Sequence, residues 1–509
     1  MKLEYLLDGV EIIDISGDSS AEVSTICYAA DKCTEGSLFV AIAGLKHDGH
    51  DFIMDAIARG ARFIAHEKDF QFPSQVTAIK VANSRRALGI LAKNYFGNPS
   101  ANLVLIAVVG TNGKTTITYL LESIFKAAGF KCGVLGTVNY RYNDNSYPAP
   151  NTTPESYELQ KILREMADKG ITHVIAEVSS HAIDLRRVDD CDFDLGVFTN
   201  LTPEHFDYHL TMENYFQAKK RFFTEVLPQS KKAHPQKMVI NGDDSWGKRI
   251  LEEVALPALT YGIEGDSAIK AASYELSLAG IKAQINLAGK TISIASSLIG
   301  KFNLYNILAA AGAAVILRIS PAVIKKGIED LSYVSGRLEK IDSSSGFSVF
   351  VDYAHKADAL KQVLQNLAEF KKKRIITVFG CGGNRDRGKR PLMGEAAAKY
   401  SDLTIVTSDN PRLEDPLDII AEIETGIDQN KVKKVAIDQL KIGNSVHSYM
   451  VIPDRRKAIE TAINRAQKGD IVLIAGKGHE DYQIIGTKKT PFDDRIVATQ
   501  ALELRSQVQ

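Results

Sequence analysis

Residues 108–116 combine a glycine-rich turn with a lysine and two threonines, side chains that suit phosphate binding. The stretch reads V-V-G-T-N-G-K-T-T and follows the apolar residues 103–107, so a buried strand is expected to end in this turn. Gly110 and Gly113 would let backbone N–H groups close around phosphate oxygens, Lys114 would supply a cation, and the Thr115 hydroxyl could hold magnesium. A helix predicted over residues 116–128 would point its N-terminus at the same phosphates. The sequence therefore favours a nucleotide enzyme over a plain strand-to-helix turn.

Alternating strand and helix patterns place this turn in an α/β fold. Strands are predicted in two series, at residues 37–42, 103–109, 173–178 and 195–199 and, after Gly336 and Arg337, at residues 347–353, 374–379, 403–407 and 471–475. Such alternation is typical of mostly parallel sheets with helices on both faces. Because ligands of open α/β sheets bind beyond the carboxyl ends of the strands, the reactive residues are expected on the loops that follow them.

Length, charge and cysteine content restrict the class of protein. A chain of 509 residues predicts about three domains, and the turn-rich residues 97–100 suit a linker. Lys and Arg together number 62, as do Asp and Glu, so no net charge favours nucleic acid, and no apolar run reaches the length of a membrane span. The N-terminus has no signal-peptide core, and the five cysteines lack metal-ligand spacing. We expect a cytoplasmic monomer with reduced thiols that acts on small molecules, without nucleic acid or membrane as a partner.

Three polar segments follow or end predicted strands downstream of the turn. They are Asn151-Thr152-Thr153-Pro154, Glu177-Val178-Ser179-Ser180-His181, and residues 199–209 with the sequence T-N-L-T-P-E-H-F-D-Y-H. Glu177 could offer a hard oxygen to magnesium, and His205 could ligate the ion or orient a carboxylate. Each signal alone is weak, because a loop histidine is more often a plain hydrogen-bonding residue and the two serines could simply cap a helix.

In combination, these segments resemble the Mur ligase family, ATP-dependent amide-forming enzymes of peptidoglycan precursor synthesis. The resemblance runs essentially from end to end. Its motifs are G-T-N-G-K-T-T at residues 110–116, E-V-S-S-H at 177–181, G-K-F-N-L-Y-N at 300–306, G-R-L-E at 336–339, D-Y-A-H at 352–355, G-C-G-G-N-R-D-R-G-K-R-P at 380–391 and G-K-G-H-E-D-Y-Q at 476–483. The last two narrow the match to the members that add the third amino acid.

The resemblance implies an α/β fold of three domains and a ligase reaction. Residues 1–99 would bind the UDP end of the substrate, residues 100–335 would form a central ATP-binding domain with a mostly parallel sheet, and residues 336–509 would form a Rossmann-like domain for the incoming amino acid. The implied reaction joins that amino acid to the γ-carboxylate of D-glutamate in UDP-N-acetylmuramoyl-L-alanyl-D-glutamate through an acyl phosphate. Such an enzyme serves cell-wall biogenesis, and with it cell shape and division.

Roles in ATP and metal binding are implied by the same resemblance. The ATP contacts would be Gly110, Thr111, Asn112, Gly113, Lys114, Thr115, Thr116, Asn303, Asn306, Arg337 and Asp352. Thr115, Glu177, His205 and Lys219 would surround Mg2+, with Lys219 carbamylated by carbon dioxide to N6-carboxylysine, which turns an ammonium into the anionic oxygen ligand that magnesium prefers. An exposed helix lysine is the alternative for Lys219, and Lys220 beside it leaves the register open. The catalytic residues would be Lys114, Lys219, Glu177, His205 and His355, the last as an acceptor of the amine proton.

The implied contacts to the UDP-muramoyl-dipeptide lie in the first two domains. They are Tyr28, Ala30, Leu45, Lys46, His47, Asn151, Thr152, Thr153, Ser179, Leu185 and Arg187. Two positions depart from the family pattern. Ala29-Ala30-Asp31 stands where Asp-Ser-Arg is usual, which removes a serine hydroxyl, and Leu185 stands where glutamine is common. We expect altered contacts and the same reaction.

Asp409-Asn410-Pro411-Arg412, after the predicted strand ending at Thr407, predicts which amino acid is added. An arginine there can hold a carboxylate with two parallel hydrogen bonds, whereas a lysine substrate has no carboxylate at its far end. The D-N-P-R form resembles the meso-diaminopimelate-adding branch. The implied diaminopimelate contacts are Arg385, Asp409, Asn410, Pro411, Arg412, Gly476 and Glu480, with Glu480 pairing the distal ammonium and Asn384 replacing a common aspartate.

Four alternatives have less support from the sequence. A lysine-adding ligase of the same family conflicts with Arg412, and a folylpolyglutamate synthetase fits poorly with residues 476–483 and with the first domain. A small-molecule kinase would explain the phosphate-binding turn alone. A catalytically inactive, nucleotide-regulated binding protein is disfavoured by the presence of Lys114, Glu177, His205 and Lys219.

Overall fold

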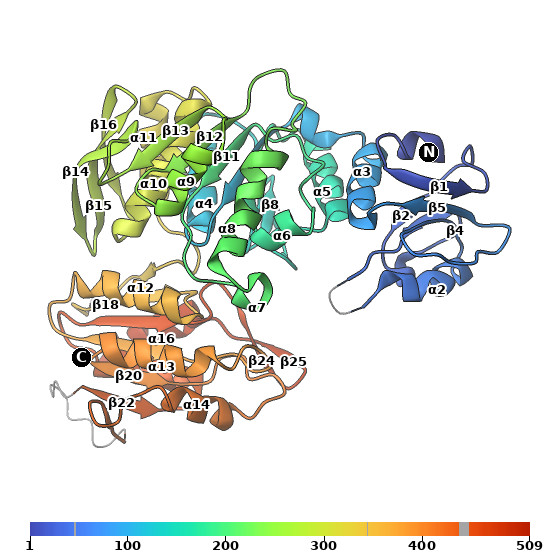
Figure 1. Ribbon diagram of the computed structural model, residues 1–509. Coiled ribbons are helices and arrows are strands. Elements are labelled where there is room, and N and C mark those ends of the chain that lie inside the picture. The colour runs from blue at the N-terminus through green and yellow to red at the C-terminus, as the bar shows by residue number, and fades with distance from the viewer. Residues whose placement is uncertain (45–46, 344, 437–446, 509) are drawn as a thin grey trace. The chain divides into compact units, whose positions relative to one another are not determined.

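The computed structural model describes residues 1–44, 47–343, 345–436 and 447–508, and the chain divides into two compact units (Figure 1). The first unit contains Met1–Ala272, Gln284–Ser293 and Tyr305–Ile328, and the second contains Ser273–Ala283, Ile294–Leu304 and Glu329–Gln509. Each unit is built from strands and helices, as the alternating patterns predicted. Domain boundaries at residues 99 and 335 stay a prediction.

The N-terminal part of the first unit is a five-stranded sheet. Its strands in spatial order are β1 (Ile12–Ser16), β5 (Thr77–Val81), β4 (Ala61–His66), β3 (Ser37–Val40) and β2 (Ile26–Cys27). All neighbours pair in parallel except β1 and β5. The helices α1 (Leu3–Leu6) and α3 (Ser84–Tyr95) bury apolar side chains on one face, and α2 (Ile53–Ala58) does so on the other. The strand predicted at residues 37–42 is β3, which ends two residues earlier.

The central sheet of the first unit carries the glycine-rich turn at the end of an inner strand. Six parallel strands lie in the order β13 (Ala258–Gly262), β12 (Lys237–Asn241), β11 (Leu195–Phe198), β6 (Val104–Val109), β10 (His173–Val178) and β7 (Cys132–Leu135). One edge adds β8 (Tyr140–Tyr142) and β9 (Asn145–Tyr147), and the other adds β14 (Ile269–Ser277), β15 (Gly280–Leu287) and β16 (Lys290–Ser296). The mostly parallel central sheet is therefore confirmed. Because Phe198 and Val178 both align with Val109, the carboxyl ends of β11, β10 and β6 meet at one edge.

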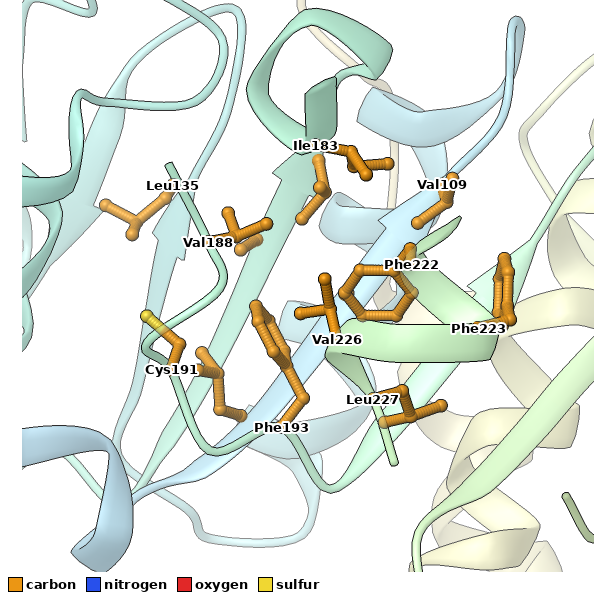
Figure 2. Close-up of a cluster of buried hydrophobic side chains, with 14 of the residues drawn as sticks. Val109, Leu135, Ile183, Val188, Cys191, Phe193, Phe222, Phe223, Val226 and Leu227 are labelled. Atoms are coloured by element: carbon orange, nitrogen blue, oxygen red, sulfur yellow. The ribbon is translucent and has the colours of Figure 1, made fainter. Parts of the chain in front are cut away.

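Helices cover both faces of this sheet, because its inner strands are buried at nearly every position. One face holds α5 (Ser156–Asp168), α6 (Ser180–Asp184), α8 (Met212–Arg221) and α9 (Ser245–Glu253). Figure 2 shows Phe193, Phe222, Phe223 and Val226 gathered in this core, where each fully buried side chain contributes about 1.5–3 kcal/mol. The other face holds α4 (Lys114–Ala127), α10 (Lys301–Ile316) and α11 (Pro321–Asp330), since Gly327 of α11 packs on Ile124 of α4 and Gly312 of α10 on Val239.

The second unit is a seven-stranded sheet covered on both faces, in agreement with the Rossmann-like fold that the resemblance implied. Its spatial order is β17 (Glu339–Ile341), β18 (Ser348–Asp352), β23 (Ile471–Ala475), β19 (Ile375–Phe379), β20 (Leu403–Val406), β22 (Ser448–Val451) and β21 (Lys433–Lys434). Only the β17–β18 pair is antiparallel among the described strands. One face carries α12 (Ala357–Ala368), α13 (Lys389–Tyr400) and α14 (Pro416–Glu424), and the other carries α15 (Arg455–Arg465) and α16 (Asp494–Val508) (Figure 1). A separate hairpin joins β24 (Tyr482–Ile485) to β25 (Lys488–Pro491).

Two global expectations can be compared with the described residues. No helix among them combines the length and apolarity needed to cross a membrane. All five cysteines have free thiols and are buried, as expected from their irregular spacing.

Asp190 is a half-buried residue of the first unit whose buried Oδ2 atom packs against α3. A Cβ atom at Gly89 would lie 2.2 Å from Asp190 Oδ2, and this oxygen has no hydrogen-bond partner among the described residues. Burial, reinforced by neighbouring Asp189, raises the pKa of Asp190 from 3.8 to about 7. The folded state therefore binds this proton more tightly than the unfolded chain does. Stability from this group is full below the unfolded pKa and is lost as the pH rises through the folded value.

Replacing Asp190 with asparagine should remove this loss, because the amide cannot ionise. We expect D190N to exceed the wild type in free energy of unfolding by about 1–2 kcal/mol at pH ~8 and by much less at pH ~4.5. Thermal unfolding at the two pH values measures the difference. D14N, at an exposed carboxyl of β1, is the control and should give no pH-dependent gain. An equal gain for D190N at both pH values would contradict the role given to ionisation.

Candidate active site

The glycine-rich turn joins β6 to α4 and has no room for side chains at its two glycines. Gly113 has a φ of +87°, and a Cβ atom at Gly110 would lie 1.8 Å from Thr199 Oγ1. The helix begins at Lys114, two residues before its predicted start, because the left-handed Gly113 leads directly into α4. The first N–H groups of α4 therefore lie next to the loop, where an anion can bind them.

The segment after β11 braces this turn. Thr111 N donates to Asn200 O at 2.9 Å, and Asn112 N donates to Asn200 Oδ1 at 3.0 Å. In return, Thr199 Oγ1 donates to Asn112 O at 2.7 Å, and Asn112 Nδ2 donates to Thr202 Oγ1 at 3.1 Å. The sequence singled out residues 199–209 for His205 and missed this bracing role. The signal for it was the polar segment at the end of a strand parallel to β6.

Two lysines converge on the turn. Lys114 Nζ donates to Gly110 O at 2.9 Å and to Thr111 O at 2.8 Å, and Lys219 Nζ also donates to Gly110 O at 2.9 Å. The side chain of Lys219 is buried, so the exposed-lysine alternative is wrong. Lys220 instead forms a 2.6 Å ion pair with Glu253, so the assignment of the modified lysine to Lys219 stays a prediction.

Glu177 stands at the same sheet edge, paired in register with Val108 of β6. Its buried carboxylate accepts hydrogen bonds from Thr137 N at 3.1 Å and from Thr137 Oγ1 at 2.9 Å. Thr115 lies buried in the first turn of α4. His205 precedes α7 (Phe206–His209) with a φ of +58°, and its ring lies 4.7 Å from that of His181. Among the described residues, no group of three or more His, Cys, Asp and Glu side chains is arranged for a metal, so the expected mixed shell stays a prediction.

Residues expected to contact the dipeptide gather around Glu177. Thr153 Oγ1 donates to Glu177 O at 2.9 Å and accepts from Ser179 N at 3.1 Å, and Arg187 Nη1 donates to Thr153 O at 3.3 Å. Thr152 Oγ1 lies 3.0 Å from Thr137 Oγ1. Ser179 also caps α6, as the plain structural interpretation predicted, by accepting from Ala182 N. Leu185 lies just after α6, and Asn151 is exposed beside this group.

A cavity of about 510 Å³ lies in the N-terminal part of the first unit. Tyr28, Ala30 and His47, which the resemblance assigns to the UDP-muramoyl-dipeptide, line it, and their contact with substrate stays a prediction. Leu45 and Lys46, expected beside them, lie outside the described residues. The cavity is also lined by Asp31, which the sequence placed in the departing Ala29-Ala30-Asp31 segment.

Sequence analysis missed two charged residues of the cavity wall, Arg85 and Glu155. Glu155 Oε2 lies 3.5 Å from Arg85 Nη1 and 3.2 Å from Arg187 Nε, so one carboxylate connects the cavity with the group around Thr153. Tyr28 OH adds a 2.8 Å hydrogen bond to Glu158 of α5. No sequence motif marked these residues, because they come together only through the packing of α3 and α5.

The predicted nucleotide contacts outside the turn occupy defined positions. A Cβ atom at Gly113 would lie 2.2 Å from Asn306 Oδ1, so Asn306 borders the turn. Asn303, one helical turn earlier in α10, is buried and donates to Ile299 O at 2.9 Å. In the second unit, Asp352 accepts from Leu338 N at 2.6 Å and Ala354 N at 2.8 Å, while burial raises its pKa.

Arg337 and His355 flank Tyr353 in the second unit. The Arg337 guanidinium lies 5.0 Å from the Tyr353 ring centroid, and the His355 ring lies 4.5 Å from it. His355 Nδ1 donates to Tyr353 O at 2.8 Å, which leaves Nε2 as the acceptor nitrogen of the neutral ring. Burial, with help from Lys389, lowers the pKa of His355 to about 4. The imidazole is therefore neutral at physiological pH and can accept a proton only weakly.

The loop after β20 presents Arg412 from a buried base. Asp409 and Asn410 are buried, and Arg412 has a left-handed backbone with a φ of +54°. Arg412 Nη1 donates to Gly383 O at 2.8 Å. Its Nε and Nη2 make no hydrogen bond with protein groups in the described ranges, so the guanidinium keeps an edge for a ligand. Arg385 lies exposed on the adjoining loop.

Glu480 is partnered within the protein. Its Oε2 accepts from Asn410 Nδ2 at 2.9 Å and from Lys477 Nζ at 3.1 Å. Gly476 lies against Asp409, where a Cβ atom would stand 2.8 Å from Oδ2. Lys477 has no exposed surface and was missed by the sequence analysis, although its place between two glycines of a recognised motif was a signal. A ligand ammonium would share the Glu480 carboxylate with this lysine.

Arg390 and Asn384 join the two loops that carry Arg385 and Arg412. The fully buried Arg390 donates to Glu414 at 2.9 and 3.0 Å and to Glu422 at 2.9 Å. Asn384, with a φ of +51°, accepts from Leu413 N at 3.0 Å through its side-chain oxygen. An asparagine oxygen makes this bond as an aspartate would, so the departure at this position leaves the loop contact intact.

A phosphate-binding turn at the carboxyl edge of a parallel sheet, served by two convergent lysines, defines the first unit as part of a nucleotide-binding α/β enzyme. Three stretches of the chain match domain models of one family. Residues 108–314 match the Mur ligase middle domain, residues 336–478 the Mur ligase glutamate ligase domain, and residues 22–96 the Mur ligase family catalytic domain. The chain belongs to the Mur ligase family.

Two relatives of the chain and one similar solved structure share the same name. A protein of Geobacter metallireducens called UDP-N-acetylmuramoyl-L-alanyl-D-glutamate–2,6-diaminopimelate ligase is 45% identical over 100% of both chains. One of the same name from Geobacter sulfurreducens is 46% identical over 98% of both chains. A solved structure of a protein of this name has a TM-score of 0.70, with 31% identity over 99% of each chain.

Loss of Arg390 should destabilise the second unit more than loss of an exposed arginine that reaches the same carboxylate. R390M leaves Glu414 without its ion-pair partner and Glu422 with only the exposed Arg387, and we expect about 2–3 kcal/mol less free energy of unfolding. R387M is the matched control, because exposed Arg387 also pairs with Glu422 and should contribute about 0–1 kcal/mol. Urea unfolding, with hydrogen exchange of the β19 and β20 amides, measures both effects. Equal losses in the two variants would contradict this ranking.

Proposed function

We propose that the chain is an ATP-dependent ligase that adds meso-2,6-diaminopimelate to UDP-N-acetylmuramoyl-L-alanyl-D-glutamate. The observation that carries the proposal is full-length identity of 45% and 46% to ligases named for this reaction, in a chain with an arginine at the diaminopimelate position. The product is a UDP-muramoyl-tripeptide for peptidoglycan. Lysine, the alternative substrate, lacks the distal carboxylate that Arg412 would bind.

The reaction has two steps. A γ-carboxylate oxygen of D-glutamate forms a bond with the γ-phosphorus of ATP, the bond to the β–γ bridging oxygen breaks, and ADP leaves. The uncharged amine of diaminopimelate then attacks the acyl carbon and gives up one proton to a base, the amide forms, and phosphate departs with the electron pair of the broken bond. Lys114 and the first N–H groups of α4 are suited to neutralise charge during phosphoryl transfer, where most of the catalytic power of such enzymes resides.

A magnesium ion would suit the donors beside the turn. Glu177 offers a buried carboxylate, Thr115 a hydroxyl and carbamylated Lys219 an anionic oxygen, all of the hard-oxygen type that magnesium prefers, with His205 nearby on its loop. When bound, the ion would screen the charges of the phosphates and position them. Carbamylation also fits the hydrogen bond of Lys219, because the modified nitrogen keeps one hydrogen that can still donate to Gly110 O.

The long substrate has a continuous set of contacts in the first unit. Its uridine end suits the cavity lined by Tyr28, Ala30 and His47, and its dipeptide suits the group around Thr153. The pair of ion contacts from Glu155 to Arg85 and Arg187 lies between these regions. Anionic groups of the substrate can replace Glu155 as partners of either arginine.

Diaminopimelate differs from lysine only by its distal carboxylate. The open edge of Arg412 is suited to bind that carboxylate with two parallel hydrogen bonds, since Nη1 is already fixed by Gly383 O. Glu480, held by Asn410 and Lys477, is suited to bind the distal ammonium. Asn303, Arg337 and Asp352 as nucleotide contacts remain part of the proposal.

Phosphate release tests the reaction and the amino acid together. With ATP, magnesium and the UDP-muramoyl-dipeptide present, we expect release only when meso-diaminopimelate is added, together with formation of the tripeptide. Release with L-lysine would place the protein in the lysine-adding branch. Release that depends on no amino acid would exclude the ligase reaction.

Removing the Arg412 guanidinium should weaken selection for the distal carboxylate. We expect R412L to raise the KM for meso-diaminopimelate about 10- to 100-fold, because a charge-assisted hydrogen-bonded pair contributes about 1.5–3 kcal/mol. The KM for ATP should stay within about twofold of the wild-type value, since Arg412 is assigned to the amino acid alone. R456M, on α15, is the control and should leave all KM values unchanged. An unchanged KM for diaminopimelate in R412L would remove Arg412 from the specificity site.

A further inference from the structure

Tyr215 of α8 is a fully buried tyrosine at the phosphate-binding turn without any role assigned above. Its hydroxyl lies 3.1 Å from Thr111 Oγ1 and donates to Glu204 Oε2 at 3.4 Å. The centroid of its ring lies 4.6 Å from Lys219 Nζ. One side chain therefore touches the turn, the segment that carries His205, and the buried lysine.

The hydroxyl acts as a fixed link between two loops. The Glu204 carboxylate can only accept, so the Tyr215 proton points toward it, and Thr111 Oγ1 can then donate to the phenol oxygen. The turn thus gains a side-chain anchor in addition to its backbone bonds with Asn200.

The ring restricts Lys219 from one side. Residues four apart in a helix lie on the same face, so Tyr215 and Lys219 are neighbours on α8. The electron-rich ring face attracts the ammonium and helps hold Nζ at the 2.9 Å hydrogen bond to Gly110 O. Carbamylation then forms an N–C bond between the neutral amine and carbon dioxide and releases one proton. The resulting carboxylate is repelled by the same ring face, so its oxygens must point away from the ring.

We propose that Tyr215 is a positioning residue that holds the Lys219 ammonium at the turn before carbamylation and directs the carbamate oxygens away from the ring, where a metal can bind them. This inference rests on the proposed carbamylation of Lys219. It extends the site to a residue whose own atoms need not touch substrate. The phenol hydroxyl and the ring have separable effects, because one anchors the turn and the other orients the lysine.

Carbon-13 NMR of protein equilibrated with labelled bicarbonate tests the inference directly, because a carbamate gives its own resonance. We expect the resonance in the wild type and its absence in K219M. In Y215L, which loses the ring, the resonance should rise about two- to fivefold at a bicarbonate concentration well below half-saturation, because the ring no longer favours the ammonium over the anionic carbamate. In Y215F, which keeps the ring, the resonance should persist while kcat falls about tenfold, because the Thr111 anchor is lost.

Y142F is the matched control, since Tyr142 is a buried tyrosine of the same unit whose hydroxyl donates to Glu165 at 3.2 Å. It should keep both the resonance and kcat. No resonance in the wild type would overturn carbamylation itself and this role with it, whereas wild-type resonance in folded Y215L would overturn only the role of Tyr215. If Y215L does not fold, Y215F decides, because an unchanged kcat would overturn the proposal.

Discussion

The carbonyl oxygen of Gly110 accepts hydrogen bonds from both Lys114 and Lys219, each at 2.9 Å. The ammonium groups of Lys114 and Lys219 repel each other, and the N–H groups of the first turn of α4 add positive potential at the same place. The arrangement is tolerable because the turn is tightly braced by residues 199–202, and it becomes favourable when anions arrive. Phosphate oxygens can neutralise Lys114, and carbamylation would replace the charge of Lys219 by the opposite one. The sheet edge, the glycines and the bracing loop all serve to keep this charge concentrated.

In the second unit, the charged side chains of neighbouring loops are arranged differently from those at the phosphate-binding turn. Its loops after β19 and β20 are joined by buried Arg390 and by the side chain of Asn384, while Arg412 is only partly used by the protein. Arg390 is held by two carboxylates through its Nη1 and Nη2 atoms and fixes the spacing of the loops, and Arg412 retains donors for a ligand. The contrast explains why two arginines of neighbouring loops can have different functions despite similar chemistry.

The sequence predicted the bounds of the strands that lead into candidate site residues better than it predicted the contacts between distant segments. β10 and β23 have their predicted bounds, and the phosphate-binding turn lies where expected, because apolar runs followed by glycine and polar residues are local signals. The bracing by Asn200, the link through Glu155 and the buried Lys477 depend on segments far apart in the chain. Glu480 illustrates the difference, since its motif was recognised from local sequence but its two protein partners were not. The helix after the turn began earlier than predicted because Gly113 needs no cap residue to enter it.

The position of Glu155 between Arg85 and Arg187 has a consequence for how the substrate is recognised. Because the two guanidinium groups share the Glu155 carboxylate, they are coupled. A ligand that displaces this carboxylate from one arginine strengthens the contact of Glu155 with the other arginine. Recognition at the uridine cavity and at the dipeptide then ceases to be additive. If the substrate binds as proposed, displacement of Glu155 at one end of the molecule would make its displacement at the other end harder, so the two ends together would bind less tightly than the sum of two separate fragments predicts.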